Sequence, residues 1–86
     1  MIVELFSSAF CGPCRTARSV LGQAARLVPQ ARFDEVDVAD DTARAEAADV
    51  SSTPTIVVRD DDGSEVFRAA GAPTLPQLLA AMGRAV

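Results

Sequence analysis

The segment Phe10-Cys11-Gly12-Pro13-Cys14 places the two cysteines of this 86-residue sequence three residues apart. An apolar run, residues 2–6, precedes it and predicts a strand, and apolar residues at helical spacing follow it. The cysteines therefore meet across the first turn of a predicted helix, with Cβ atoms roughly 5 to 6 Å apart. A disulfide needs about 3.8 Å, and the first turn can adjust because its amides have no partner within the helix. We expect the pair to form and break a disulfide with little local movement.

The two cysteines are expected to have different roles. The sulfur of Cys11 would lie beside unpaired amides and the positive end of the helix dipole, and both favour the thiolate, so Cys11 is the predicted nucleophile. Cys14 lies one turn further on, on the apolar face, so we expect it to be buried and to act as the resolving thiol. Between them, Gly12 permits close approach and Pro13 stiffens the turn.

Other uses of a cysteine pair give the competing predictions. The cysteines could be small buried hydrophobes, or half of a structural zinc site. A structural zinc normally has four protein ligands, and with no histidine in the chain the other two would be carboxylates or come from a second chain. A non-catalytic module holding a metal or an iron–sulfur cluster, across a dimer with added glutathione, is the alternative class. We expect no metal and no bound cofactor.

Composition excludes several other functions. Hydrophobic residues make up 49% of the chain and charged residues 23%, which suits one packed domain over residues 1–86. The net charge is -4 and the arginines are scattered, so no nucleic-acid partner is expected. No apolar run approaches the roughly 18 residues of a membrane span, and no secretory signal pattern is present, so we expect a cytoplasmic protein without a membrane partner. Without histidine or lysine, Ser-His-Asp, Cys-His and Schiff-base catalysis are excluded.

The remaining pattern predicts the order β-α-β-α-β-β-α. The predicted strands are residues 2–6, 32–38, 55–58 and 65–68, and the helices are the segment from the cysteines to Pro29, residues 42–48 and a segment capped by Thr74. Asp62-Gly63 is a strong hairpin signal between the last two strands. A strand–helix–strand unit gives a parallel crossover and the hairpin adds antiparallel strands. We therefore predict an α/β fold, a four-stranded mixed sheet with helices on both faces.

Together, Cys-Gly-Pro-Cys after a strand and Thr53-Pro54-Thr55 before a strand resemble the thioredoxin superfamily. The resemblance covers nearly the whole chain and is to the minimal thioredoxin fold, with a length closer to a glutaredoxin. It implies a cis Thr53–Pro54 bond that faces the cysteines and offers the Thr53 backbone to an extended substrate. It also implies that Gly71 borders the substrate groove, and that Phe10 lies in the groove surface or in the core. From the residues alone, Pro54 could simply begin a strand and Gly71 could simply make a turn.

Three positions depart from the family pattern. Phe10 stands where thioredoxins usually carry tryptophan, Leu5 where they carry a buried aspartate, and Glu35 where they carry the lysine opposite it. Glu4 is next to Leu5, but successive residues of a strand point to opposite faces, so Glu4 is not expected to replace the acid. We expect proton transfer to Cys14 to rely on water.

The resemblance implies a thiol–disulfide oxidoreductase that reduces protein disulfides by dithiol exchange. A monomer is expected, with a flavoprotein thioredoxin reductase or glutathione as electron donor. A glutathione-dependent, glutaredoxin-like reductase is the alternative, although such proteins more often carry Cys-Pro-Tyr-Cys. Thr53 fits glutathione binding, and Arg15 or Arg18 could meet its carboxylates, or both arginines could be ordinary solvated residues.

Overall fold

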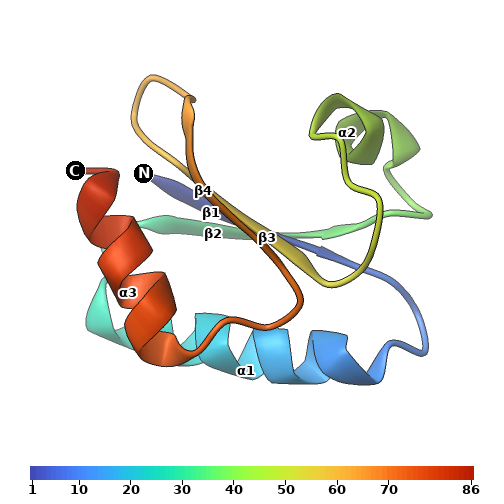
Figure 1. Ribbon diagram of the computed structural model, residues 1–86, viewed down its shortest axis with the longest axis horizontal. Coiled ribbons are helices and arrows are strands. Elements are labelled where there is room, and N and C mark those ends of the chain that lie inside the picture. Colours follow the sequence, from blue (N-terminus) through green and yellow to red (C-terminus); the bar gives the residue numbers. More distant parts are fainter.

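The computed structural model describes residues 1–86, and its seven elements follow the predicted order. They are β1 (Ile2–Ser7), α1 (Gly12–Leu27), β2 (Arg32–Asp37), α2 (Thr42–Ala47), β3 (Thr55–Arg59), β4 (Glu65–Ala70) and α3 (Leu75–Arg84). Figure 1 shows α1 and α3 on one face of the sheet and α2 on the other. The predicted mixed sheet with helices on both faces is confirmed. None of the helices is long and apolar enough to span a membrane.

The sheet has the strand order β2-β1-β3-β4. β1 pairs in parallel with β2, and α1 is the crossover between them, while β3 pairs antiparallel with both β1 and β4. The parallel pairing places the carboxyl end of β1, from which the cysteine segment leaves, beside the end of β2. Because β1 is a central strand, the loop that follows it places the start of α1 near the end of the two middle strands rather than at an edge of the sheet.

Each face of the sheet has its own apolar core. The larger core lies under α1 and α3 and includes Val3 and Leu5 of β1, whereas Phe6 belongs to the smaller core under α2. This alternation follows from the two-residue period of a strand. Only Ala45 of α2 itself is buried, so this short helix packs on the sheet through a small contact.

Glu4 is buried on the α2 face, as the alternation predicts, and two arginines neutralise it. Its Oε1 accepts a hydrogen bond of 2.7 Å from Arg59 Nε, and its Oε2 accepts one of 2.7 Å from Arg44 Nη2. Arg44 Nη2 also donates to Asp34 at 3.1 Å. The hydrogen bond to Glu4 is the main cause that raises the pKa of Arg44. The network therefore ties α2 to three strands.

Element ends differ from the prediction by one or two residues. β1 includes Ser7 and β3 includes Arg59, whereas the second strand ends at Asp37 and α2 at Ala47, each one residue early. β4 continues through Ala69–Ala70, two residues beyond the predicted end. These alanines have low strand propensity, but the ladder pairs them with Ile56 and Thr55 and holds them extended.

Candidate active site

Cys11 and Cys14 form a disulfide at the start of α1, with Cα atoms 5.3 Å apart. Cys11 is the N-cap residue, and the backbone N–H of Cys14 donates to its Sγ at 3.2 Å. Cys14 is only 1% exposed, whereas Cys11 is partly exposed. The predicted difference in burial is therefore confirmed: Cys11 is the more accessible cysteine, and Cys14 lies in the protein interior.

The residues around the cysteines leave Cys11 open to a partner. Phe10 has a left-handed backbone, φ 59°, and its side chain is fully exposed, which excludes the predicted alternative of a core contact. Gly12 and Pro13 are exposed in the first turn, and a Cβ atom placed on Gly12 would meet no atom within 4 Å. A chain that approaches Cys11 would meet bare backbone and an aromatic ring.

The Pro54 loop lies beside the cysteine loop. The Thr53–Pro54 bond is cis, as the resemblance implies. Ser8 Oγ and Thr53 Oγ1 are 2.7 Å apart and share a hydrogen bond. Gly71, at φ 98°, donates its N–H to the Pro54 carbonyl at 2.8 Å. The structure thus joins three segments that are distant in sequence, and it brings the predicted site residues Thr53, Pro54 and Gly71 together.

Ser8 contacts the predicted site residue Thr53, but the sequence alone did not identify Ser8 as part of the site. Ser7-Ser8 indicates only the turn after a strand, because serine is common in turns. Ser8 and Thr53 are 45 residues apart, so no local spacing connects them. The family resemblance identifies Thr53 because it precedes Pro54. It does not predict that the Ser8 hydroxyl group forms a hydrogen bond with Thr53.

Glu35 forms an ion pair with α1 near the site. It accepts hydrogen bonds from Arg18 Nε at 2.8 Å and Nη2 at 2.7 Å, and from Ser7 Oγ at 2.9 Å. The Arg18 hydrogen bond is the main cause that lowers the pKa of Glu35, so the carboxylate is ionised at neutral pH. Arg18 is therefore held by the protein's own carboxylate, whereas Arg15 is exposed and belongs to no ion pair.

No acid occupies the family's buried aspartate position. Leu5 is fully buried there and packs in the larger core with Ala17 and Leu21 of α1. Glu4 is on the opposite face, where Arg44 and Arg59 neutralise it. On the α1 side of the sheet, the cross-strand partner of Leu5 is Glu35, whose carboxylate is bound by Arg18 and Ser7.

A hollow of about 550 Å³ is lined in part by Cys11. Its lining includes the predicted residues Phe10, Cys11 and Gly12, together with Arg15 and Arg18, and no acidic residue. The surface beside the disulfide is therefore partly apolar and carries positive charge.

Comparisons with known proteins agree with this geometry. The Thioredoxin family model matches residues 1–84. A thioredoxin from Chlamydia pneumoniae is 32% identical over 71 residues, which cover 83% of this chain and 68% of that protein. A thioredoxin from Mycoplasma genitalium is 41% identical over 70 residues, which cover 81% and 68%. The X-ray structure of Fasciola hepatica thioredoxin superposes with a TM-score of 0.84 at 32% identity, covering 99% of this chain and 80% of that one.

These findings agree with the cysteine pair, the cis proline and the mixed sheet. The chain therefore belongs to the thioredoxin family, and its Cys11–Cys14 pair fits the active site of a thiol–disulfide oxidoreductase.

Proposed function

We propose that the chain reduces protein disulfides, with Cys11 as the nucleophile and Cys14 as the resolving thiol. The observation that carries the proposal is the pair itself: a partly exposed cysteine at a helix N-terminus, bonded to a cysteine that is 1% exposed. After reduction, the Cys14 N–H and the helix dipole would stabilise a thiolate on Cys11. Burial would keep Cys14 protonated until Cys11 has reacted.

The reaction has two exchange steps. The Cys11 thiolate attacks one sulfur of the substrate disulfide, the substrate S–S bond breaks, and the other substrate sulfur leaves as a thiolate that takes a proton from solvent. Cys14 then loses its proton and attacks Cys11 Sγ, and the second substrate sulfur leaves and is protonated. The substrate gains two electrons and two protons, and the chain is left with the Cys11–Cys14 disulfide. With Leu5 beneath the site, we propose that water accepts the Cys14 proton.

The substrate would lie across the joined loops. Phe10, Gly12 and Pro13 would contact it around the sulfur, and the Thr53 backbone would pair with it as with an added strand, beside Pro54 and Gly71. The proposal includes a monomer in the cytoplasm, where thiol-reducing systems keep such pairs reduced.

A flavoprotein thioredoxin reductase is the electron donor we propose. One relative, 35% identical over 57 residues that make up 11% of its length, is named NADPH-dependent thioredoxin reductase 3, from Arabidopsis thaliana. Glutathione is the second candidate, because Arg15 is a free cation beside Cys11 that could bind a carboxylate. Two glutathione molecules would then supply the two electrons and become glutathione disulfide.

The test is reduction of insulin disulfides, with a thioredoxin reductase and NADPH in one assay and with glutathione and its reductase in another. We expect turnover in the first assay, and none with Cys11→Ser. Cys14→Ser should trap a covalent mixed disulfide that mass spectrometry detects. Absence of turnover with either donor, or full turnover by Cys11→Ser, would show that the proposal is wrong.

The metal-binding alternative is tested on the freshly purified protein. Elemental analysis and the absorption spectrum would reveal a bound metal or cluster, and thiol titration would show whether it blocks the cysteines. We expect two free thiols that oxidise together to one disulfide. A stoichiometric metal that protects both thiols would favour the alternative.

A further inference from the structure

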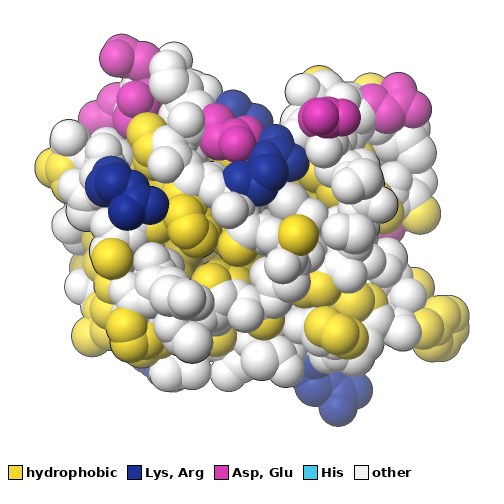
Figure 2. All heavy atoms as spheres, in the orientation of Figure 1, with side chains coloured by type: hydrophobic (Ala, Val, Ile, Leu, Met, Phe, Trp, Pro, Cys, Tyr) yellow, Lys and Arg dark blue, Asp and Glu magenta, His cyan; other side chains and the backbone are white.

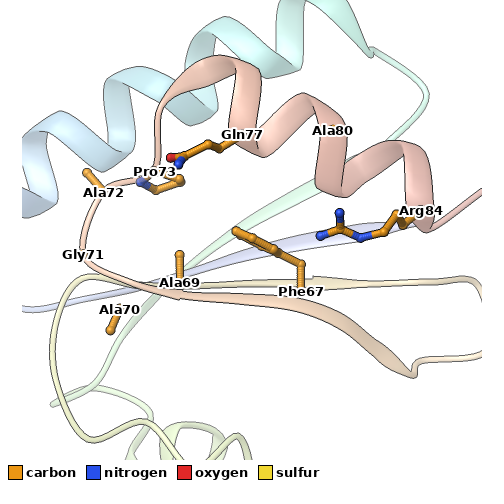
Figure 3. A pocket seen from close by; sticks show the side chains of 9 residues that line it. All are labelled: Phe67, Ala69, Ala70, Gly71, Ala72, Pro73, Gln77, Ala80 and Arg84. Atoms are coloured by element: carbon orange, nitrogen blue, oxygen red, sulfur yellow. The ribbon is translucent and has the colours of Figure 1, made fainter.

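A groove of about 390 Å³ lies between β4 and α3. Figure 3 shows Phe67 and Ala69 pointing from β4 toward the helix, the Gly71–Pro73 turn at one end, and Arg84 at the other. Five of its nine lining residues are alanine or glycine, so much of the space between helix and sheet stays open. In the orientation of Figure 1, Figure 2 shows hydrophobic surface between the sheet and α3.

One end of the groove is continuous with the proposed substrate-binding loops. Gly71 lines the groove and donates its N–H to the Pro54 carbonyl at 2.8 Å. A Cβ atom at Gly71 would meet no atom within 4 Å, so its backbone faces open space. A substrate segment that leaves the cysteines past Pro54 would therefore reach the groove at Gly71.

The other end carries the groove's only charge. Arg84 is exposed and belongs to no ion pair, and its guanidinium carbon lies 5.7 Å from the centre of the Phe67 ring. The other lining residues are uncharged. A groove that is lined mainly by alanine, Phe67 and Pro73 and is positive at its end complements a chain that has small apolar residues followed by an acidic one.

We propose that this groove binds the part of a protein substrate that flanks the attacked cysteine, and that Arg84 selects an acidic residue in it. The inference rests on the proposed disulfide reductase function and adds a substrate class to it. From Gln77 to Arg84 the helix rises about 10 Å at ~1.5 Å per residue. An extended chain covers that distance in about three residues. The preferred substrate therefore carries an aspartate or glutamate about three residues beyond the position that lies at Gln77.

The experiment measures single-turnover reduction of peptide disulfides by the prereduced protein, in ~0.15 M salt, with acid quench, alkylation and mass spectrometry. The peptides differ only in an aspartate or an asparagine placed three to six residues from the cysteine. We expect the aspartate peptide with the best placement to react about two- to fivefold faster, the range of an exposed ion pair. Arg84→Glu should abolish or reverse this preference. Arg26→Glu is the matched control, since Arg26 is exposed, unpaired and outside the groove, and it should keep the preference.

A second variant tests the groove rather than its charge. Ala80→Trp would fill the space, so both peptides should react several-fold more slowly, while reaction with the small neutral disulfide 4,4′-dithiodipyridine stays unchanged. Equal rates for aspartate and asparagine peptides at every placement, or equal effects of Arg84→Glu and Arg26→Glu, would overturn the groove proposal alone. If the protein reduces no peptide of either kind, the proposed function fails and the groove proposal fails with it.

Discussion

Ser8 and Thr53 join the cysteine loop to the Pro54 loop through one hydrogen bond of 2.7 Å. We predict that Ser8→Ala lowers kcat/KM for peptide disulfides by about two- to tenfold, the equivalent of one hydrogen bond of about 0.5–1.5 kcal/mol. The reason is that Thr53 would be held less firmly relative to Cys11, so a bound substrate would reach the sulfur less often in the reactive geometry. The measurement is single-turnover peptide reduction, alongside the rate at which iodoacetamide alkylates Cys11, which should not change.

Ser19→Ala is the control for that prediction, because Ser19 is an exposed hydroxyl on α1 outside the site. Thr53→Val should lower kcat/KM as much as Ser8→Ala does. The double variant should show no larger decrease than either single variant, because each of the three variants removes the same hydrogen bond. Additive losses, or an effect of Ser8→Ala no larger than that of Ser19→Ala, would contradict the positioning role.

At the residue scale, the sequence identifies as site residues those that belong to a recognisable local motif. Cys11 and Cys14 are a turn apart, and Pro54 stands between threonines at the start of a strand, so their patterns indicate their places. Ser8 has no such pattern, because its contact depends on how two loops fold together. The same is true of Arg18 and Glu35, which are 17 residues apart and meet only because α1 packs beside β2.

At the scale of elements, the Arg18–Glu35 ion pair ties α1 to β2 and should make stability depend on pH. The pKa of Glu35 is lowered from its usual 4.5, chiefly by the Arg18 hydrogen bond, so the folded state favours the ionised carboxylate. This stabilisation is present above about pH 4.5 and is lost as the pH falls through the lowered value. We predict that Arg18→Gln slightly reduces the free energy of unfolding at pH 7, and that the difference from the unaltered protein narrows below pH 4.5.

Urea unfolding at a series of pH values measures that difference. Both side chains are more than a third exposed, so the effect should be small and should shrink further in 1 M salt. Arg26→Gln, on the same helix and outside any ion pair, should leave the pH profile unchanged. A difference between Arg18→Gln and the unaltered protein that stays constant down to pH 2 would rule out Glu35 as the cause.

Element order could be predicted better than element ends. Alternating and helical periods, the Asp-Gly turn and the Thr74 cap locate the seven elements, because each is a local signal. The extension of β4 through Ala69–Ala70 could not be predicted, since alanine favours helices and only the ladder to β3 makes these residues extended. The groove depends on this extension, because Ala69 and Ala70 line it.

At the scale of the whole molecule, the buried Glu4 network holds α2, β1, β2 and β3 together. We predict that Glu4→Gln lowers the free energy of unfolding by about 1–3 kcal/mol, because Arg44 and Arg59 lose a charged partner. The loss of unfolding free energy should be smaller than that caused by breaking a fully buried ion pair, because Arg44 and Arg59 are partly exposed and water can solvate them. Urea unfolding at pH 7 gives the value.

Glu46→Gln is the matched control, because Glu46 is an exposed carboxylate on α2 that belongs to no ion pair. Equal stability of the two variants would contradict a stabilising role for the network. Alternation along β1 predicts that Glu4 faces away from Leu5, but its partners come from residues 40 and 55 positions away, which no local pattern connects.

Strand β2 forms one margin of the sheet, and four of its six residues are charged: Arg32, Asp34, Glu35 and Asp37. An unpaired strand margin is a template for stacking further chains into fibrils, and charged side chains oppose that stacking. Two β2 strands laid side by side would bring several carboxylates against one another. The charges of β2 therefore oppose polymerisation through this edge of the sheet, in a protein about half of whose residues are hydrophobic.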